Sequence, residues 1–195
     1  MLRFKLFGIE IRLNFLFFAV LTVILLTDQT GIPVWALIAS CIHECGHMVA
    51  FFCFHQTPRL ISFELGGIRM QGQRMEQLKT WQEAVILLAG SGVNFLAFFL
   101  HLAVQQNLFA SIHLLIGCFN LLPVKSLDGG KLLELLFQCI FPFHLAYRSV
   151  QICSWGFCLL LLIFGGYLAY YLNFTLLAFG IYLLISLLAE HRKRA

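Results

Sequence analysis

Residues 33–54 have the sequence PVWALIASCIHECGHMVAFFCF, a long apolar stretch that contains two histidines and a glutamate. Successive residues of an α-helix are turned by about 100°, so positions four apart lie on one face. His43 and His47 are therefore expected to point the same way, with Glu44 beside them. Ionisable side chains are costly inside a helix that crosses a membrane, and their presence there indicates a functional site. The stretch predicts both a membrane-spanning helix and a site built on it.

The spacing of the two histidines is typical of zinc sites. Two neutral imidazoles one helical turn apart can supply two ligands to a tetrahedral Zn²⁺, and the adjacent carboxylate of Glu44 can accept a proton from an activated water. A histidine within a membrane is more often an interhelical hydrogen bonder, and the five-residue pattern also arises by chance in soluble chains. A haem site with two axial histidines fits poorly, because two side chains on one helix face cannot reach opposite faces of one iron.

The composition indicates a membrane protein. Of the 195 residues 61% are hydrophobic, only 11% are charged and 21 are phenylalanine, which is far from the usual composition of a soluble domain. We expect a single membrane core over residues 1–195, without a separate soluble domain. The first long apolar run lacks a small-x-small cleavage site, which argues against a cleavable signal peptide. The seven cysteines lie mostly in apolar runs without a Cys-x-x-Cys pair and are expected to be reduced.

Apolar runs predict an all-α polytopic membrane protein with about six transmembrane helices. The expected spans are residues 13–26, 33–54, 81–104, 108–124, 150–172 and 174–189. An apolar piece at 132–147 is expected before the last two. Alternating polar and apolar residues predict two short surface β-hairpins at 3–12 and 60–71, the second turning at Gly66-Gly67.

The positive charges predict the orientation in the membrane. With six spans and a cytoplasmic amino terminus, all 13 Lys and Arg residues fall on the inside, in segments 1–12, 55–80, 125–148 and 190–195. This asymmetry follows the positive-inside rule and places both termini in the cytoplasm. The net charge of +4 then serves topology and contact with the anionic lipid bilayer, so it does not indicate nucleic-acid binding.

A third metal ligand is expected among the acidic residues, because catalytic zinc usually has three protein ligands and one open position. Six of the nine acidic residues lie in surface segments or at span ends, which leaves Glu44, Asp128 and Glu134. Asp128 lies at a break in an apolar segment, between Pro123 and Gly129-Gly130. Irregular backbone at membrane depth is tolerated where it is buried in protein or lines a wet cavity. We therefore expect a broken helix around Asp128, with Asp128 as the third ligand of one zinc per chain and Glu134 as the weaker candidate.

Three ordered motifs make the chain resemble the site-2 protease family of intramembrane zinc metalloproteases. They are His43-Glu44-Cys45-Gly46-His47, Ala89-Gly90-Ser91-Gly92-Val93-Asn94 and Asn120-Leu-Leu-Pro-Val-Lys-Ser-Leu-Asp128-Gly129-Gly130. Within the family the chain is most similar to the bacterial subgroup of stage IV sporulation proteases, which process a sigma-factor precursor. Ser91 and Ser126 stand where the family often has proline. We expect no PDZ domain and none of the CBS domain that sporulation members carry.

The resemblance implies an enzyme of the bacterial cell membrane that hydrolyses a peptide bond in or near a transmembrane segment of a membrane-anchored protein. It implies that His43, His47 and Asp128 hold the zinc and that Glu44 is the general base. The substrate could be a sigma-factor precursor, an anti-sigma factor or the remnant of a signal peptide. A regulatory membrane partner or a homo-oligomer stays open.

Roles for four further residues are expected with alternatives. Asn94 and Asn120 carry amides that can steady an oxyanion or hold the substrate backbone, and interhelical hydrogen bonding is the alternative for both. Gly66 and Gly67 belong by resemblance to a loop that captures substrate by strand pairing, and a plain surface hairpin is the alternative. His101 and His113 are expected to be interhelical hydrogen bonders or part of the core.

The competing class of function is a non-catalytic membrane protein, either a metal-binding or transport protein or a pseudo-protease. A transporter would need ionisable residues spaced through several spans, whereas here they gather on two segments. A pseudo-protease would usually have lost Glu44 or a metal ligand.

Overall fold

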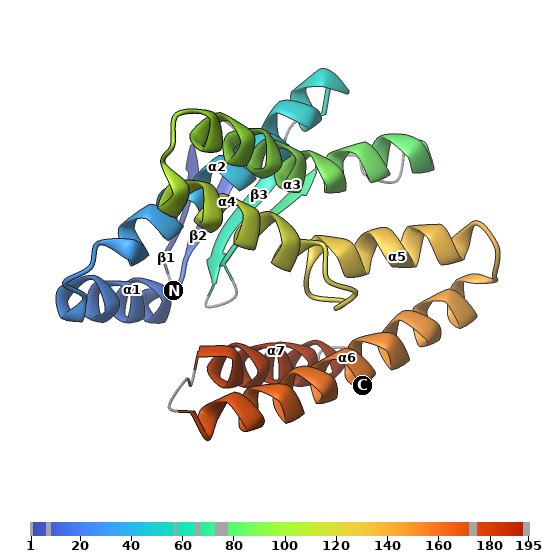
Figure 1. The fold of residues 1–195 in the computed structure, drawn as a ribbon. Coiled ribbons are helices and arrows are strands. Elements are labelled where there is room, and N and C mark those ends of the chain that lie inside the picture. The colour runs from blue at the N-terminus through green and yellow to red at the C-terminus, as the bar shows by residue number, and fades with distance from the viewer. Residues whose placement is uncertain are drawn as a thin grey trace. The chain divides into compact units, whose positions relative to one another are not determined.

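The computed structural model describes residues 2–6, 9–56, 58–64, 67–72, 78–171 and 175–192, which form seven α-helices and four β-strands (Figure 1). The chain divides into two compact units, Met1–Cys118 and Phe119–Ala195, called here the first and second unit. The predicted class, a mostly helical chain with short hairpins, is confirmed.

The first unit contains a four-stranded sheet. Its strands are β1 (Leu2–Leu6), β2 (Ile9–Leu13), β3 (Pro58–Glu64) and β4 (Gly67–Gly72), in the order β1-β2-β3-β4. Both predicted hairpins are present as antiparallel pairs. The parallel pairing of β2 with β3, with Glu10 opposite Leu60 and Leu13 opposite Phe63, was not predicted from the sequence. The two hairpins therefore make one sheet, and within the described residues β1 and β4 are its edges.

Four helices complete the first unit: α1 (Phe15–Thr27), α2 (Ile32–Cys53), α3 (Thr80–Ala103) and α4 (Asn107–Asn120), the last of which crosses the unit boundary. The turn before α2 is held by the carboxylate of Asp28, which accepts the backbone N–H groups of Thr30 and Gly31 at 3.0 and 2.6 Å. Gly31 has a φ of 72°, which glycine adopts without strain. Pro33 lies in the first turn of α2, where the backbone N–H that proline lacks would have no acceptor within the helix.

Helices α2 and α3 pack closely because a glycine lies between them. A Cβ built on Gly46 would lie 2.6 Å from the carbonyl oxygen of Ala89, so only glycine lets the two backbones approach this far. Next to this contact, Ala50 and Phe51 of α2 and Ile86 of α3 form a buried apolar cluster. The face of α2 that carries His43 and His47 is thereby held against α3.

The second unit consists of an irregular segment, residues 121–127, followed by α5 (Asp128–Gln138), α6 (Phe143–Ala169) and α7 (Thr175–Arg192). The predicted helix break before Asp128 is therefore present. Val124 anchors the irregular segment, because it is fully buried in a cluster that also contains Cys158 and Leu161 of α6 and Leu183 of α7. The backbone N–H of Lys125 donates to the hydroxyl of Ser154 on α6 at 2.9 Å.

Among the residues that the structure describes, three helices, α2, α3 and α6, are long and apolar enough to cross a membrane, with 22, 24 and 27 residues. At about 1.5 Å per residue each spans about 30 Å or more, the thickness of the hydrocarbon core of a bilayer. Three shorter apolar helices, at Phe17–Thr27, Asn107–Asn120 and Leu176–Leu188, lie at the remaining predicted spans. Large apolar side chains such as Phe99 on α3 and Ile163 on α6 are more than 60% exposed, as expected of residues that face lipid.

Two predicted helix boundaries differ from the structure. The span expected at 108–124 ends at Asn120, because the chain turns before Pro123, which has no N–H to continue the hydrogen bonding of a helix. The span expected at 150–172 begins earlier, at Phe143 after Pro142, and it includes part of the separate apolar piece expected at 132–147. All seven cysteines, each among the described residues, are free thiols.

Candidate metal centre

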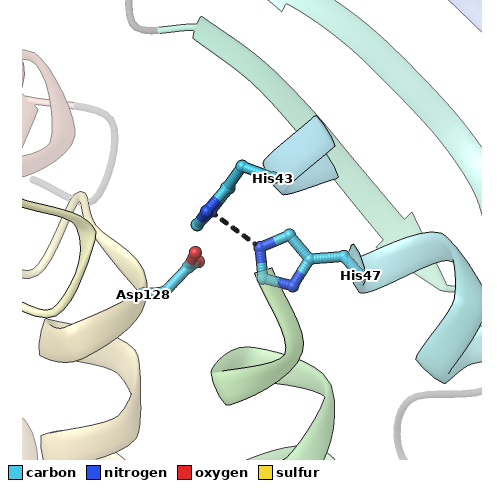
Figure 2. A group of neighbouring side chains, drawn as sticks. All are labelled: His43, His47 and Asp128. Carbon is cyan, nitrogen blue, oxygen red and sulfur yellow. Dashed lines mark hydrogen bonds between the residues drawn. The ribbon is translucent and has the colours of Figure 1, made fainter. Parts of the chain in front are cut away.

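His43 and His47 lie one turn apart on α2, and both are buried, with 3% and 7% of their surface exposed. Their Nε2 atoms are 3.1 Å apart, and Figure 2 shows this hydrogen bond as a dashed line. The two rings are almost perpendicular, at 84°. Each ring thus presents the same nitrogen to its partner, and these are the atoms that could bind one metal ion together.

The other ring nitrogen of His47 is held by the neighbouring helix. His47 Nδ1 lies 2.7 Å from the backbone carbonyl oxygen of Ile86 on α3. A carbonyl can only accept a hydrogen bond, so the proton of the neutral ring is on Nδ1 and the lone pair is on Nε2. A hydrogen bond of this kind orients histidine ligands in metal sites.

His43 is held in a similar way by a side chain of α3. Its Nδ1 lies 3.3 Å from Nδ2 of Asn94, whose own surface is completely buried. Oδ1 of Asn94 lies 3.1 Å from Nδ1 of His113 on α4. Asn94 therefore links three helices, which is the interhelical alternative considered for it from the sequence.

Gly90 on α3 keeps the space beside the two histidines clear. A Cβ built on Gly90 would lie 2.5 Å from Nε2 of His47 and 2.7 Å from Nε2 of His43. The two Nε2 atoms therefore border a space that any side chain at position 90 would fill. Imidazole nitrogens are preferred ligands of Zn²⁺, so these residues fit that ion.

The second unit contains the acidic candidates, and their surroundings differ. Asp128 is the first residue of α5, is buried, and accepts a bond from the ammonium group of Lys131 at 3.0 Å. Glu134, on the same helix, lies 3.9 Å from the buried ammonium group of Lys125, which also lies over the ring of Tyr147. Glu134 is thus used as the counter-charge of a buried lysine, whereas Asp128 is bonded to a half-exposed one.

The remaining candidates from the sequence lie in different places. Glu44 is partly buried on α2, directly after His43. Asn120 is the last residue of α4 and is also partly buried. Gly67 opens β4, opposite Glu64, and Gly66 lies outside the described residues.

Sequence reasoning gave no role to Gly90 and assigned His113 only to a general class of interhelical contacts. The available signal was the four-residue spacing of Gly90 and Asn94, which places both on one face of α3. The spacing could not show that this face meets His43, because residues 43 and 94 are 51 positions apart.

Comparisons with known proteins find similar sequences. Residues 105–165 match the family described as Peptidase family M50. The chain is 32% identical over 183 residues to the Stage IV sporulation protein FB of Bacillus subtilis (strain 168), which covers 87% of this chain and 62% of that protein. It is 26% identical over 182 residues to a zinc metalloprotease of Methanocaldococcus jannaschii, which covers 83% of this chain and 52% of that protein.

A solved structure has the same fold. It is described as a site-2 protease from Methanocaldococcus jannaschii and matches with a TM-score of 0.73 at 20% identity, over 97% of this chain and 94% of that one. The chain spans 62% and 52% of the length of the two curated relatives.

Proposed function

We propose that the chain is a member of peptidase family M50, the family of the site-2 proteases, and that it is an intramembrane zinc metalloprotease. The match of residues 105–165 to that family and the 32% identity over 183 residues to the sporulation protein support this assignment. The substrate is a membrane-anchored protein, which the protease cuts at a peptide bond in or near a transmembrane segment. One observation carries the proposal: the Nε2 atoms of His43 and His47 lie 3.1 Å apart, beside the space kept clear by Gly90. This pair lies on a helix long and apolar enough to cross a membrane.

Asp128 is the proposed third ligand, completing a set for one zinc per chain. His43, His47 and Asp128 are each buried, and each offers one ligand atom. A buried carboxylate needs a cation or hydrogen bonds to offset its desolvation, and the half-exposed ammonium group of Lys131 lies 3.0 Å from the carboxylate of Asp128. Glu134, the other candidate, has the buried ammonium group of Lys125 beside it. Three protein ligands leave the fourth tetrahedral position open, which is the pattern of catalytic zinc.

The proposed chemistry is peptide hydrolysis with Glu44 as the general base. Zinc in such a ligand set makes water nucleophilic at neutral pH and polarises the scissile carbonyl. Glu44 follows His43 directly on α2, so its carboxylate is tethered to the metal-binding turn. It accepts the proton of the attacking water and returns it to the leaving amine. Asn94 is bonded to His43 and His113, and Asn120 is the amide proposed to steady the oxyanion.

Substrate capture is proposed at the outer edge of β4. Within the described residues β4 is an edge strand, and it begins at Gly67 in the loop expected to capture substrate. An extended segment of substrate could pair with this edge through main-chain hydrogen bonds. A peptide bond inside a helix is shielded by its own hydrogen bonds, so the substrate must unwind locally. By likeness to the sporulation protein, a bacterial membrane-bound precursor such as that of a sigma factor is the first substrate to try.

The decisive experiment compares zinc content and cleavage in Glu44→Gln and wild type. The probes are membrane-anchored reporter chains co-expressed with the protein, and cleavage is followed by immunoblot. Zinc is expected to stay at one per chain in the variant, while cleavage falls by about 10²-fold or more because the proton acceptor is lost. Asp128→Asn is expected to lose zinc, and Glu134→Gln is the matched control that keeps it.

Two results would contradict the proposal. Zinc retained in Asp128→Asn would remove Asp128 from the ligand set. A wild-type protein that binds no zinc, or that keeps zinc and cuts none of the reporters, would favour the non-catalytic membrane protein.

A further inference from the structure

We propose that His113 is a positioning residue of the metal centre: through Asn94, its tautomer is coupled to which ring nitrogen of His43 is free to bind the metal. The inference rests on the proposed function only in taking His43 as a ligand. His113 lies on α4 and is buried, with 5% of its surface exposed. It contacts the metal centre through one hydrogen bond, from its Nδ1 to Oδ1 of Asn94 at 3.1 Å.

The hydrogen bonds of the site form a continuous chain in one direction. His113 Nδ1 donates to Oδ1 of Asn94, and Nδ2 of Asn94 donates to Nδ1 of His43. His43 Nε2 then donates to Nε2 of His47, whose Nδ1 donates to the carbonyl oxygen of Ile86. The direction is set at the last bond, because a carbonyl accepts and never donates. In this direction each neutral ring of the hydrogen-bonded chain carries one proton.

Metal binding requires part of this chain of hydrogen bonds to reverse its donor-to-acceptor direction. A histidine binds a metal through an unprotonated nitrogen, so Nε2 of His43 must lose its proton. The neutral ring then carries its proton on Nδ1, which needs an acceptor instead of a donor. Asn94 meets this need by turning its amide over, so that Oδ1 faces His43 and Nδ2 faces His113.

His113 can follow this reversal because its neutral ring is a donor at one nitrogen and an acceptor at the other. With Nδ2 of Asn94 facing it, Nδ1 of His113 must accept, so its proton moves to Nε2. Each ring still carries one proton and the site as a whole neither gains nor loses one. An apolar residue at position 113 would leave one buried polar atom of the Asn94 amide without its hydrogen-bond partner. This atom is Oδ1 in one orientation of the amide and Nδ2 in the other, so the free-energy cost depends on the orientation.

His101 provides a matched control, because it touches His113 without joining the chain. The two rings stack with their centroids 5.2 Å apart. Nδ1 of His101 donates to the carbonyl oxygen of Ala97 on its own helix, at 2.8 Å. His101→Phe therefore disturbs the packing against His113 and leaves the four hydrogen bonds of the chain in place.

The first test measures the tautomer of His113 in the wild-type chain. The full chain is labelled with ¹⁵N-histidine in detergent, and nitrogen NMR spectra are recorded after treatment with a chelator and after loading with zinc. The signals of His113 are assigned from their loss in His113→Asn. The proton of His113 is expected on Nδ1 without zinc and on Nε2 with it. The same tautomer in both states would overturn the proposal.

The second test measures zinc affinity by competition with a chelator. His113→Leu is expected to weaken zinc binding by about 10- to 100-fold, the usual effect of removing a partner of a ligand. His113→Asn is expected to restore most of the affinity, because its amide lies at the place of Nδ1 and can donate or accept. His101→Phe should bind zinc as wild type does.

The possible outcomes separate this inference from the proposed function. Unchanged affinity in His113→Leu, with wild-type protein that does bind zinc, would overturn the inference alone. Wild-type protein that binds no zinc would overturn the proposed function and the inference with it. If His113→Leu does not fold, the wild-type spectra and the affinity of His113→Asn decide.

Discussion

Gly90 is the residue at which a single added carbon would change the metal centre most directly. Its missing side chain leaves the space that Nε2 of His43 and Nε2 of His47 both border. A Cβ there cannot be accommodated by a small shift, because hydrogen bonds with α3 fix both rings at their Nδ1 atoms. The chemistry of the site thus depends on a residue that carries no functional group.

Gly90→Ala is therefore expected to reduce zinc content more than tenfold while the helix content measured by circular dichroism stays unchanged. The added methyl group would lie within 2.7 Å of both Nε2 atoms and would take the place of the ion. Gly92→Ala is the matched control on the same helix, because no described atom lies within 4 Å of its added Cβ. Equal zinc content in the two variants would show that the space beside Gly90 is not the metal position.

At the scale of elements, the start of α5 depends on how closely the preceding segment folds back on it. A Cβ on Gly129 would collide with the carbonyl group of Leu121, and one on Gly130 with that of Val124. Val124 itself is fixed in the core between α6 and α7. The first turn of α5, which carries Asp128, is thereby built against a segment that cannot move away.

Gly130→Ala is expected to destabilise the protein by about 1–3 kcal/mol, because backbone atoms cannot yield to the added methyl group. At about 2–4 °C per kcal/mol for a chain of this size, the midpoint of thermal unfolding in detergent should fall by several degrees. Gly156→Ala, inside α6 with no described atom within 4 Å of the added Cβ, is the control. It should be neutral or slightly stabilising, since alanine is the better helix former. Shifts of the same sign in both variants would contradict this account of the packing.

At the scale of the whole molecule, the charges predict the orientation of a chain whose described residues include three helices long and apolar enough to cross a membrane. The predicted inside segments carry all 13 Lys and Arg residues. Alkaline phosphatase, which is active only outside the cytoplasm, is expected to be inactive when fused after Ala195. Inserted at position 106, between α3 and α4, it should be active. Green fluorescent protein at the same two positions should show the opposite pattern. Reporter activities that placed both positions on the same side of the membrane would disprove the predicted topology.

The sequence by itself determined what depends on neighbours along the chain. The apolar runs located the helices, the alternating stretches located both hairpins, and Pro123 with Gly129-Gly130 located the break before Asp128. The spacing of His43 and His47 already placed them on one helix face, because the geometry of an α-helix is local. The motifs also carried the resemblance to the site-2 protease family, since the chemistry requires those residue types at that spacing.

Only the tertiary structure decided which of these elements and side chains contact one another. It paired β2 with β3 in parallel, although the two strands are far apart in the sequence and no turn motif joins them. It brought Asn94 to His43 and the carbonyl group of Ile86 to His47, and it gave Glu134 a buried lysine as its neighbour. Such contacts depend on which helix faces approach and how closely, and periodicity along one helix carries no information about its partner. The proposed ligands could therefore be named from the sequence, whereas the hydrogen bonds that orient their side chains could not.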